Sequence, residues 1–232
     1  MSAVRLPRPV NLLRRAWFWI KEQVFLKAHA DRAARFAAIY HANMWKNPES
    51  ASGFGSTLAA TGPTRERLAE LIGRYGPASI LDAPCGDFNW MRTLCFAGDY
   101  TGVDIVPELV ARNQQQYGGE RRRFVCGDIV TDPLPRADMV LSREALNHLP
   151  LADATLALER LAKAATRLLV VTHYPGLSAN ADQPASFRYR ALNLTVAPFG
   201  LRKPDDIIDE SHFEPGKVLG VWDLSAGPLR NA

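Results

Sequence analysis

Cysteines, long apolar runs and internal repeats are all scarce in this chain. Three cysteines occur in 232 residues, Cys85, Cys95 and Cys126, too few and too irregularly spaced for a disulfide scaffold or a cysteine-based zinc site. The uncharged apolar run from Ala16 to Ile20 is far shorter than the ~20 residues that span a bilayer. No segment repeats at a fixed period, which excludes a solenoid. We therefore expect a chain of the reducing cytoplasm that holds no metal.

Positive charge is concentrated near the N-terminus. Residues 1–48 carry nine basic and two acidic side chains, a net charge of +7, which leaves −3 for the rest of a chain whose total is +4. The basic segment could meet phosphates of nucleic acid or lipid, but the nearly neutral remainder gives little reason to expect a groove for nucleic acid, which leaves RNA as a minor alternative. We predict a basic helical extension over 1–48 and one main domain over 49–232.

Residues 11–29 mix basic and apolar side chains at helical spacing. Such a segment either docks on the main domain or lies weakly on an anionic membrane surface, where basic and aromatic side chains both find partners. We favour docking, because a further helix expected over 31–40 leads into residues 49–56 and would close one wall of a ligand site. The expected location is cytoplasmic, with contact at the inner face of the membrane as the alternative.

Helical and strand-like stretches alternate from residue 63 onward. Short, continuously apolar strands that alternate with helices are typical of an α/β, doubly wound parallel sheet covered on both faces. Two later stretches, 192–197 and 217–224, are expected to form a terminal antiparallel pair. Strands are expected over 79–81, 100–104, 123–126, 138–141 and 167–172, and helices over 63–75, 88–97, 107–116 and 152–166.

Acidic residues follow three successive strands of this expected sheet. Ligands of doubly wound sheets bind at the carboxyl ends of the strands. The first strand leads into a turn in which Gly86 would let a ligand approach the backbone, and the helix expected to follow would favour a carboxylate. Asp104, 18 residues after Gly86, ends the second strand, where a carboxylate accepts hydrogen bonds from ribose hydroxyls. Asp128 ends the third and could accept from an adenine amino group. The set predicts a nucleoside ligand.

The first turn lacks the glycines of a nicotinamide-binding loop. Pro84 stands where the first glycine of Gly-x-Gly-x-x-Gly would fall, and Asn89 where the third would fall. Asp87 would repel a diphosphate but attract a ligand that carries an ammonium or sulfonium charge. S-adenosylmethionine carries both groups.

The ordered motifs of the chain resemble those of class I S-adenosylmethionine-dependent methyltransferases over about residues 76–175. A narrower set resembles one bacterial and eukaryotic branch of that superfamily and extends the likeness over about residues 45–224. The resemblance implies a Rossmann-like sheet of seven strands, mostly parallel, whose last strand is antiparallel, but it does not identify the methyl acceptor. The superfamily motifs are at 81–86, 103–105, 127–129 and 138–141, and the narrower ones at 49–56, 85–90, 190–194 and 220–222.

We predict cofactor contacts at the ends of the first four strands. Trp90 could equally belong to the core, and Cys85 has no neighbour that marks it as a nucleophile. The predicted contact residues are Asp82, Ala83, Pro84, Cys85, Gly86, Asp87, Trp90, Asp104, Ile105, Asp128, Ile129 and Ser142.

Two residues are predicted to act on the acceptor. His173 follows the fifth strand and is the preferred base, because imidazole titrates near neutrality, although a packed core histidine is the alternative. Arg143 follows the fourth strand and either binds the acceptor or forms an ion pair with Glu144. His148 is interpreted as a packing residue. Residues 190 and 193 match the narrower motif and either contact the acceptor or brace the sheet.

These patterns favour an enzyme that moves the methyl group of S-adenosylmethionine to a small-molecule or saccharide-like acceptor, at oxygen or nitrogen, by in-line displacement. A nucleoside-binding or scaffolding protein without turnover is the alternative, because a fold alone does not prove catalysis. An NAD-dependent reductase is disfavoured by the missing glycines. The oligomeric state is left open.

Overall fold

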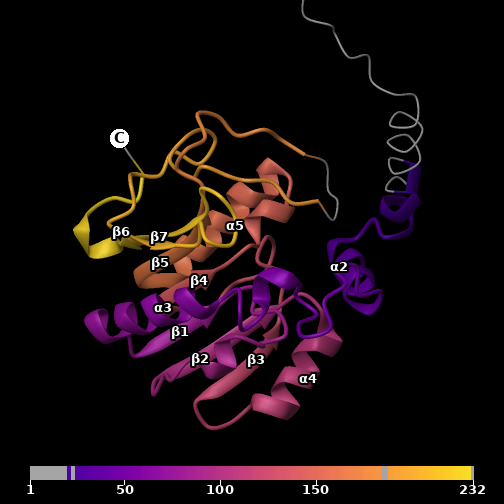
Figure 1. Ribbon diagram of the computed structural model, residues 1–232, viewed down its shortest axis with the longest axis horizontal. Helices are drawn as coiled ribbons and strands as arrows, with labels where there is room; N and C mark the ends of the chain where they lie inside the picture. Colours follow the sequence, from indigo (N-terminus) through magenta and orange to yellow (C-terminus); the bar gives the residue numbers. More distant parts are fainter. Residues whose placement is uncertain (1–19, 22–23, 184–187, 231–232) are drawn as a thin grey trace, which may run out of the picture.

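A seven-stranded sheet forms the centre of the computed structural model, which describes residues 20–21, 24–183 and 188–230 (Figure 1). The strand order is β3-β2-β1-β4-β5-β7-β6. Strands β1 to β5 pair in parallel, while β7 runs antiparallel to both β5 and β6. The expected doubly wound architecture with one antiparallel strand is confirmed. The strands are β1 (Ser79–Asp82), β2 (Asp99–Asp104), β3 (Arg122–Cys126), β4 (Ala137–Ser142), β5 (Ala165–His173), β6 (Asp206–Asp209) and β7 (Val218–Asp223).

Helices cover both faces of this sheet. Apolar side chains of α5 (Leu151–Ala164) belong to one buried cluster, and those of α3 (Gly62–Tyr75) and α4 (Pro107–Tyr117) to a second. Central strands are buried on both sides as a result, which explains their continuous apolar sequence. Short 3₁₀ turns occur at Phe54–Ser56, Met91–Thr93, Leu146–His148 and Leu224–Ala226.

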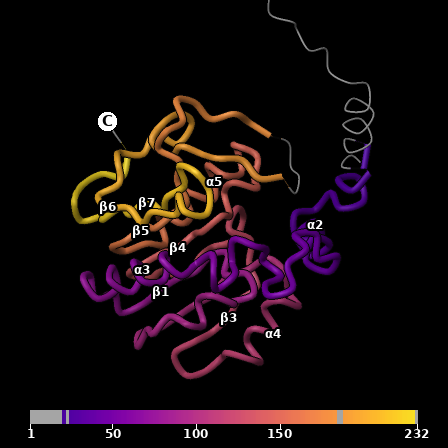
Figure 2. Tube along the Cα trace, viewed as in Figure 1, coloured from indigo at the N-terminus to yellow at the C-terminus, as the bar shows by residue number. Residues whose placement is uncertain are grey.

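The N-terminal helix α2 (Arg32–His41) forms where a helix was expected over 31–40. The Asp31 carboxylate caps it by accepting the Ala34 N–H at 2.9 Å. In Figure 2 this helix lies on the opposite side of the molecule from β6. Most of the segment 11–29, including its consecutive aromatic residues Trp17, Phe18 and Trp19, lies outside the described residues, and the division of the chain at residue 48 stays a prediction.

Two expected elements are wrong. No regular helix covers 88–97, where only the 3₁₀ turn Met91–Thr93 forms, because Gly86 and Phe88 both adopt positive φ angles of 54° and 58°. The expected helix N-terminus after the first turn is therefore absent. Residues 192–197 form turns instead of a strand, and the antiparallel pair consists of β6 and β7.

The Asn193 side chain, whose role could not be decided from the sequence, holds the turns at 192–197. The Asn193 amide donates to the carbonyl oxygen of Leu177 at 2.6 Å, and the Asn193 carbonyl accepts the Thr195 N–H at 2.9 Å. Neither Asn193 nor Arg190 lines the pocket described below. These contacts favour the bracing role for Asn193 over contact with an acceptor.

Candidate active site

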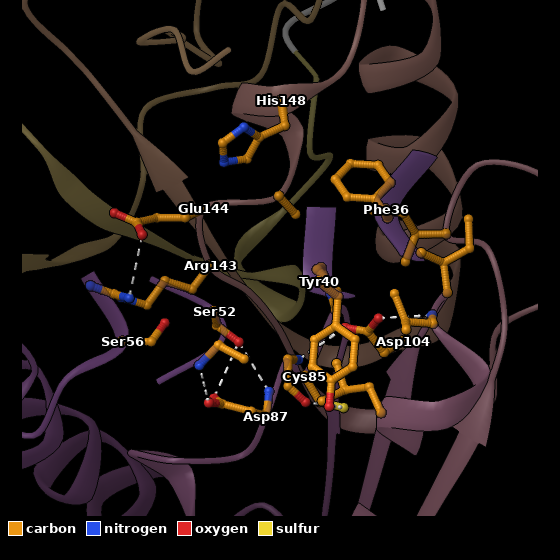
Figure 3. Close-up of a pocket in the computed structure, with 18 of the residues that line it drawn as sticks. Phe36, Tyr40, Ser52, Ser56, Cys85, Asp87, Asp104, Arg143, Glu144 and His148 are labelled. Atoms are coloured by element: carbon orange, nitrogen blue, oxygen red, sulfur yellow. Dashed lines mark hydrogen bonds and ion pairs between the residues drawn. The ribbon is translucent and has the colours of Figure 1, made fainter. Parts of the chain in front are cut away.

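A pocket lies at the carboxyl ends of β1, β2, β3 and β4 (Figure 3). Ten of the twelve predicted cofactor contacts line it. The exceptions, Ala83 and Ser142, are buried at the ends of β1 and β4. Lining residues from the predicted set are Asp82, Pro84, Cys85, Gly86, Asp87, Trp90, Asp104, Ile105, Asp128 and Ile129.

Asp104 is fixed by the backbone around it. Its carboxylate accepts the Gly86 N–H at 3.0 Å and the Val106 N–H at 3.1 Å. Burial raises the pKa of this carboxyl to about 6, although the backbone donors oppose the shift. The first turn and the end of β2 are thereby joined in one rigid corner of the pocket.

Asp82 is the second buried carboxyl in this corner. It accepts the Tyr100 hydroxyl at 2.7 Å. Burial raises its pKa to about 7, the hydrogen bond from Tyr100 opposes the shift, and the nearby charge of Asp104 adds to it. The site therefore holds two carboxyls that a cationic ligand would stabilise in their charged form.

The turn after β1 is packed against the segment 49–56. A Cβ at Gly86 would lie 2.3 Å from the Ser52 hydroxyl oxygen, so only glycine fits here. Asp87 accepts the Ser50 hydroxyl at 3.0 Å and the Ala51 N–H at 2.8 Å. The carboxylate predicted to attract a cationic ligand thus also binds the preceding segment to the turn.

Helix α2 supplies a wall that covers the pocket. Arg32, Phe36 and Tyr40 all line it, and their spacing places them on one face of the helix. The Arg32 guanidinium pairs with Asp128, the carboxylate predicted to meet adenine, and with Asp153 of α5 at 2.7 Å. This placement agrees with a helix that closes one wall of the site.

Arg143 and Glu144 begin a network of buried charges beside the pocket. Arg143 pairs with Glu210 at 2.7 Å and lies 3.7 Å from Glu144, while Lys217 pairs with Glu144 and with Glu210 at 3.3 Å. Although burial opposes it, the charges of Arg143 and Lys217 lower the pKa of Glu210. The ion-pair interpretation of Arg143 therefore has a geometric basis, with Glu210 as the main partner.

The two histidines near the site differ in placement. His173 is fully buried, its Nδ1 accepts the Leu194 N–H at 3.1 Å, and burial lowers its pKa to about 4. It packs against Trp222 and is not among the residues that line the pocket. His148, interpreted from sequence as a packing residue, does line it. A base role for His173 stays a prediction that this geometry does not favour.

A family model for a methyltransferase domain matches residues 80–167, the segment that contains β1 to β4 and their acidic ends. An uncharacterised methyltransferase of Mycobacterium tuberculosis is 33% identical over 99 residues, which cover 41% of this chain and 49% of that protein. A protein of Mycobacterium bovis matches to the same extent. Residues 80–167 are therefore similar to a methyltransferase domain. The chain spans about half the length of the curated methyltransferases it matches.

Solved methyltransferase structures share the fold. The Burkholderia thailandensis 1,6-didemethyltoxoflavin N1-methyltransferase, solved with its substrate and S-adenosylhomocysteine, has a TM-score of 0.56 and 19% identity, covering 96% of this chain and 92% of that one. The N-methyltransferase NodS of Bradyrhizobium japonicum has a TM-score of 0.57 and 14% identity, covering 79% and 97%. At these identities the likeness shows the common architecture alone.

Sequence reasoning missed several residues that line the pocket. Most belong to segments that only tertiary packing brings to the site, although Arg32, Phe36 and Tyr40 repeat every four residues, a spacing that could have identified the lining face. The lining residues outside the predicted set are Arg32, Phe36, Tyr40, Trp45, Ala51, Ser52, Ser56, Val106, Leu109, Gly127, Arg143, Glu144, Ala145, His148 and Leu149, of which only Arg143 was predicted, as an acceptor residue.

Across residues 20–21, 24–183 and 188–230, none of the helices is both long and apolar enough to cross a membrane.

Proposed function

We propose that the protein binds S-adenosylmethionine in this pocket and transfers its methyl group to a small-molecule or saccharide-like acceptor, at oxygen or nitrogen. The observation that carries the proposal is the convergence of Asp82, Asp104 and Asp128, from three strand ends, on one pocket. Bound there, S-adenosylmethionine supplies a methyl group on a positively charged sulfur.

The residues present suit this ligand. Asp104, held by two backbone N–H groups, keeps acceptor capacity for ribose hydroxyls. Asp82 offers a carboxyl to the ammonium group, and Asp128 lies where an adenine amino group can donate. The positive φ of Gly86 keeps a side chain out of the turn, where a Cβ would meet Ser52. Helix α2 lines one wall of the site, and a wall that limits the access of water strengthens the electrostatic contacts within.

Calorimetry with S-adenosylmethionine and with NAD tests the cofactor assignment. We expect S-adenosylmethionine to bind and NAD not to bind. Asp104→Ala should weaken binding by about 1–3 kcal/mol, because ribose hydroxyls lose a charged acceptor. The control is Asp99→Ala at the exposed opposite end of the same strand, which should bind as the wild type does. Binding of NAD, or unchanged affinity in a folded Asp104→Ala variant, would contradict the assignment.

Transfer itself is tested with labelled cofactor and the low-molecular-weight fraction of a cell extract. We expect label to appear in one or more small molecules, with loss of transfer in Asp104→Ala. Binding of S-adenosylmethionine without transfer to any compound would favour the scaffolding alternative.

A further inference from the structure

The side of the pocket away from Asp104 carries a distinct set of groups. Figure 3 shows Asp104, Tyr40 and Phe36 on one side, Arg143 and Glu144 on the other, and His148 at the far end. If the nucleoside binds at Asp104, as proposed above, these remaining groups face the acceptor. Their chemistry then limits what the acceptor is.

Formal charges on the acceptor side are already neutralised. Arg143 donates to Glu210 at 2.7 Å and to the Gly55 carbonyl at 2.9 Å, and Glu144 accepts from Lys217. Glu210 and Lys217 are fully buried, so their charges depend on these pairs. Arg143 Nη2 has no hydrogen-bond partner among the described residues, but two cations and two carboxylates leave this wall without net charge, which favours an uncharged acceptor.

Trp45 and apolar side chains form the rest of this wall. Trp45 lines the pocket, and its ring lies 5.9 Å from the His148 ring. Leu149 and Ala145 add apolar surface. Such walls favour a flat acceptor with few polar groups over a saccharide, whose many hydroxyls would each need a partner.

His148 is oriented so that one ring nitrogen is available. Its Nδ1 lies 3.0 Å from the carbonyl oxygen of Arg188, and because a carbonyl only accepts, Nδ1 must carry the proton. Nε2 then bears a lone pair, and within the described residues no hydrogen bond to it is found. Trp45 and Tyr189, the latter 5.3 Å away, hold the ring between them.

Burial keeps the His148 ring neutral. It lowers the pKa of His148 below the usual value, the hydrogen bond to the Arg188 carbonyl and the charge of Glu144 act in the opposite direction, and the charge of Arg190 adds to the lowering. A neutral imidazole with a free lone pair is the form that accepts a proton.

We propose, on the basis of the proposed methyl transfer, that His148 is the general base for methylation of a hydroxyl group on a flat, uncharged aromatic acceptor. Nε2 takes the hydroxyl proton while the oxygen forms its bond to the methyl carbon. The carbon–sulfur bond breaks, and its electron pair stays on sulfur, which becomes neutral. The products are a methyl ether, S-adenosylhomocysteine and an imidazolium that returns its proton to water. A phenol fits this base, because phenols titrate near pH 10 and are more acidic than sugar hydroxyls.

Nitrogen-15 NMR of the imidazole rings tests the orientation of His148 without any acceptor. We expect a neutral ring with the proton on Nδ1 at pH 7 and a pKa below 6.5. His148→Asn assigns the signal, since it removes the ring and keeps an amide that can donate to the Arg188 carbonyl. A proton on Nε2, or a doubly protonated ring at pH 7, would overturn the proposal.

A library of uncharged phenols and the corresponding anilines tests the reaction. We expect methylation of phenols, and in His148→Asn a fall in kcat of about 10²–10⁴ with loss of the rise in rate with pH. Calorimetry should give that variant a dissociation constant for S-adenosylmethionine within about twofold of the wild type, since no cofactor contact is removed. His212→Gln, outside the pocket, is the matched control and should retain both rate and pH profile.

Four outcomes would overturn the base or the acceptor class. Loss of the pH dependence in His173→Asn but not in His148→Asn would return the role to His173. Methylation of anilines alone, or of neither class although S-adenosylmethionine binds, would exclude a phenol acceptor while leaving the proposed function intact. Absence of S-adenosylmethionine binding would overturn both the proposed function and the role of His148 as general base.

Discussion

For Asp82 and Asp104, the role as ligand contacts could be predicted from the sequence, but the protonation state of the carboxyls could not. Their positions at strand ends follow from the apolar runs that precede them, so the sequence identifies both as ligand contacts. Their raised pKa values follow from burial in the folded chain, which no local pattern indicates. The two carboxyls therefore bind protons in the unliganded protein at pH values where exposed aspartates do not.

This predicts how the stability of the unliganded protein depends on pH. The folded-state pKa of Asp82, about 7, lies above the ordinary 3.8, so the folded chain holds a proton that the unfolded chain releases. The stabilisation is complete below pH 3.8 and is lost as pH rises toward 7, by at most about 1.4 kcal/mol per pH unit. Urea unfolding between pH 4 and 8 should show a smaller loss in Asp82→Asn, whose amide carbonyl still accepts from Tyr100. Parallel curves for the two proteins would contradict the shift.

His173 and His148 show a similar limit, because their positions near the site could be predicted from the sequence and the directions of their side chains could not. His173 directly follows β5, and a strand end is a sound place to expect a functional side chain, yet the ring turns into the core against Trp222. His148 lies in the segment 144–149, whose helical pattern indicated a packing residue. Its exposure to the pocket depends on the 3₁₀ turn Leu146–His148 and on the Arg188 carbonyl, 40 residues away. Side-chain direction after a strand is set by tertiary contacts that the sequence does not display.

At the scale of elements, regular helices and strands followed the hydrophobic pattern and irregular segments did not. Helices α3, α4 and α5 lie within about two residues of their expected bounds. The segment 88–97 has apolar residues that suggested a helix, but Phe88 is buried among the rings of Tyr100 and Phe124 with a positive φ. Packing of one aromatic side chain prevailed over helical spacing.

Helix α2 is the element whose attachment can be tested by a single substitution. Arg32, with 18% of its side chain exposed, pairs with Asp128 and Asp153, so Arg32→Ala should lower the free energy of unfolding by about 1.5–3 kcal/mol. Amide hydrogens of α2 should also exchange faster. Arg67→Ala removes an exposed pair with Glu70 on α3 and serves as control, with an expected loss of less than about 1 kcal/mol. Equal losses in the two variants would mean that Arg32 does not hold the helix on the pocket.

At the scale of the whole molecule, the fold brings segments distant in sequence to one pocket. Strand ends from β1 to β4 form its base, α2 and the 49–56 segment cover it, and Lys217 and Glu210 next to β6 and β7 neutralise its charged wall. The base could be predicted because parallel strands end at the same edge of the sheet. The cover and the charged wall depend on contacts between remote segments, and sequence patterns indicate only that the segments exist.

The central claim is that this pocket holds the nucleoside of S-adenosylmethionine, and a crystal structure of the full chain with S-adenosylhomocysteine tests it most directly. The account predicts ribose hydroxyls within hydrogen-bonding distance of the Asp104 carboxylate, adenine beside Asp128, and the sulfur facing the side that carries Arg143, Glu144 and His148. S-adenosylhomocysteine bound outside the pocket, or inside it with its ribose away from Asp104, would contradict the account.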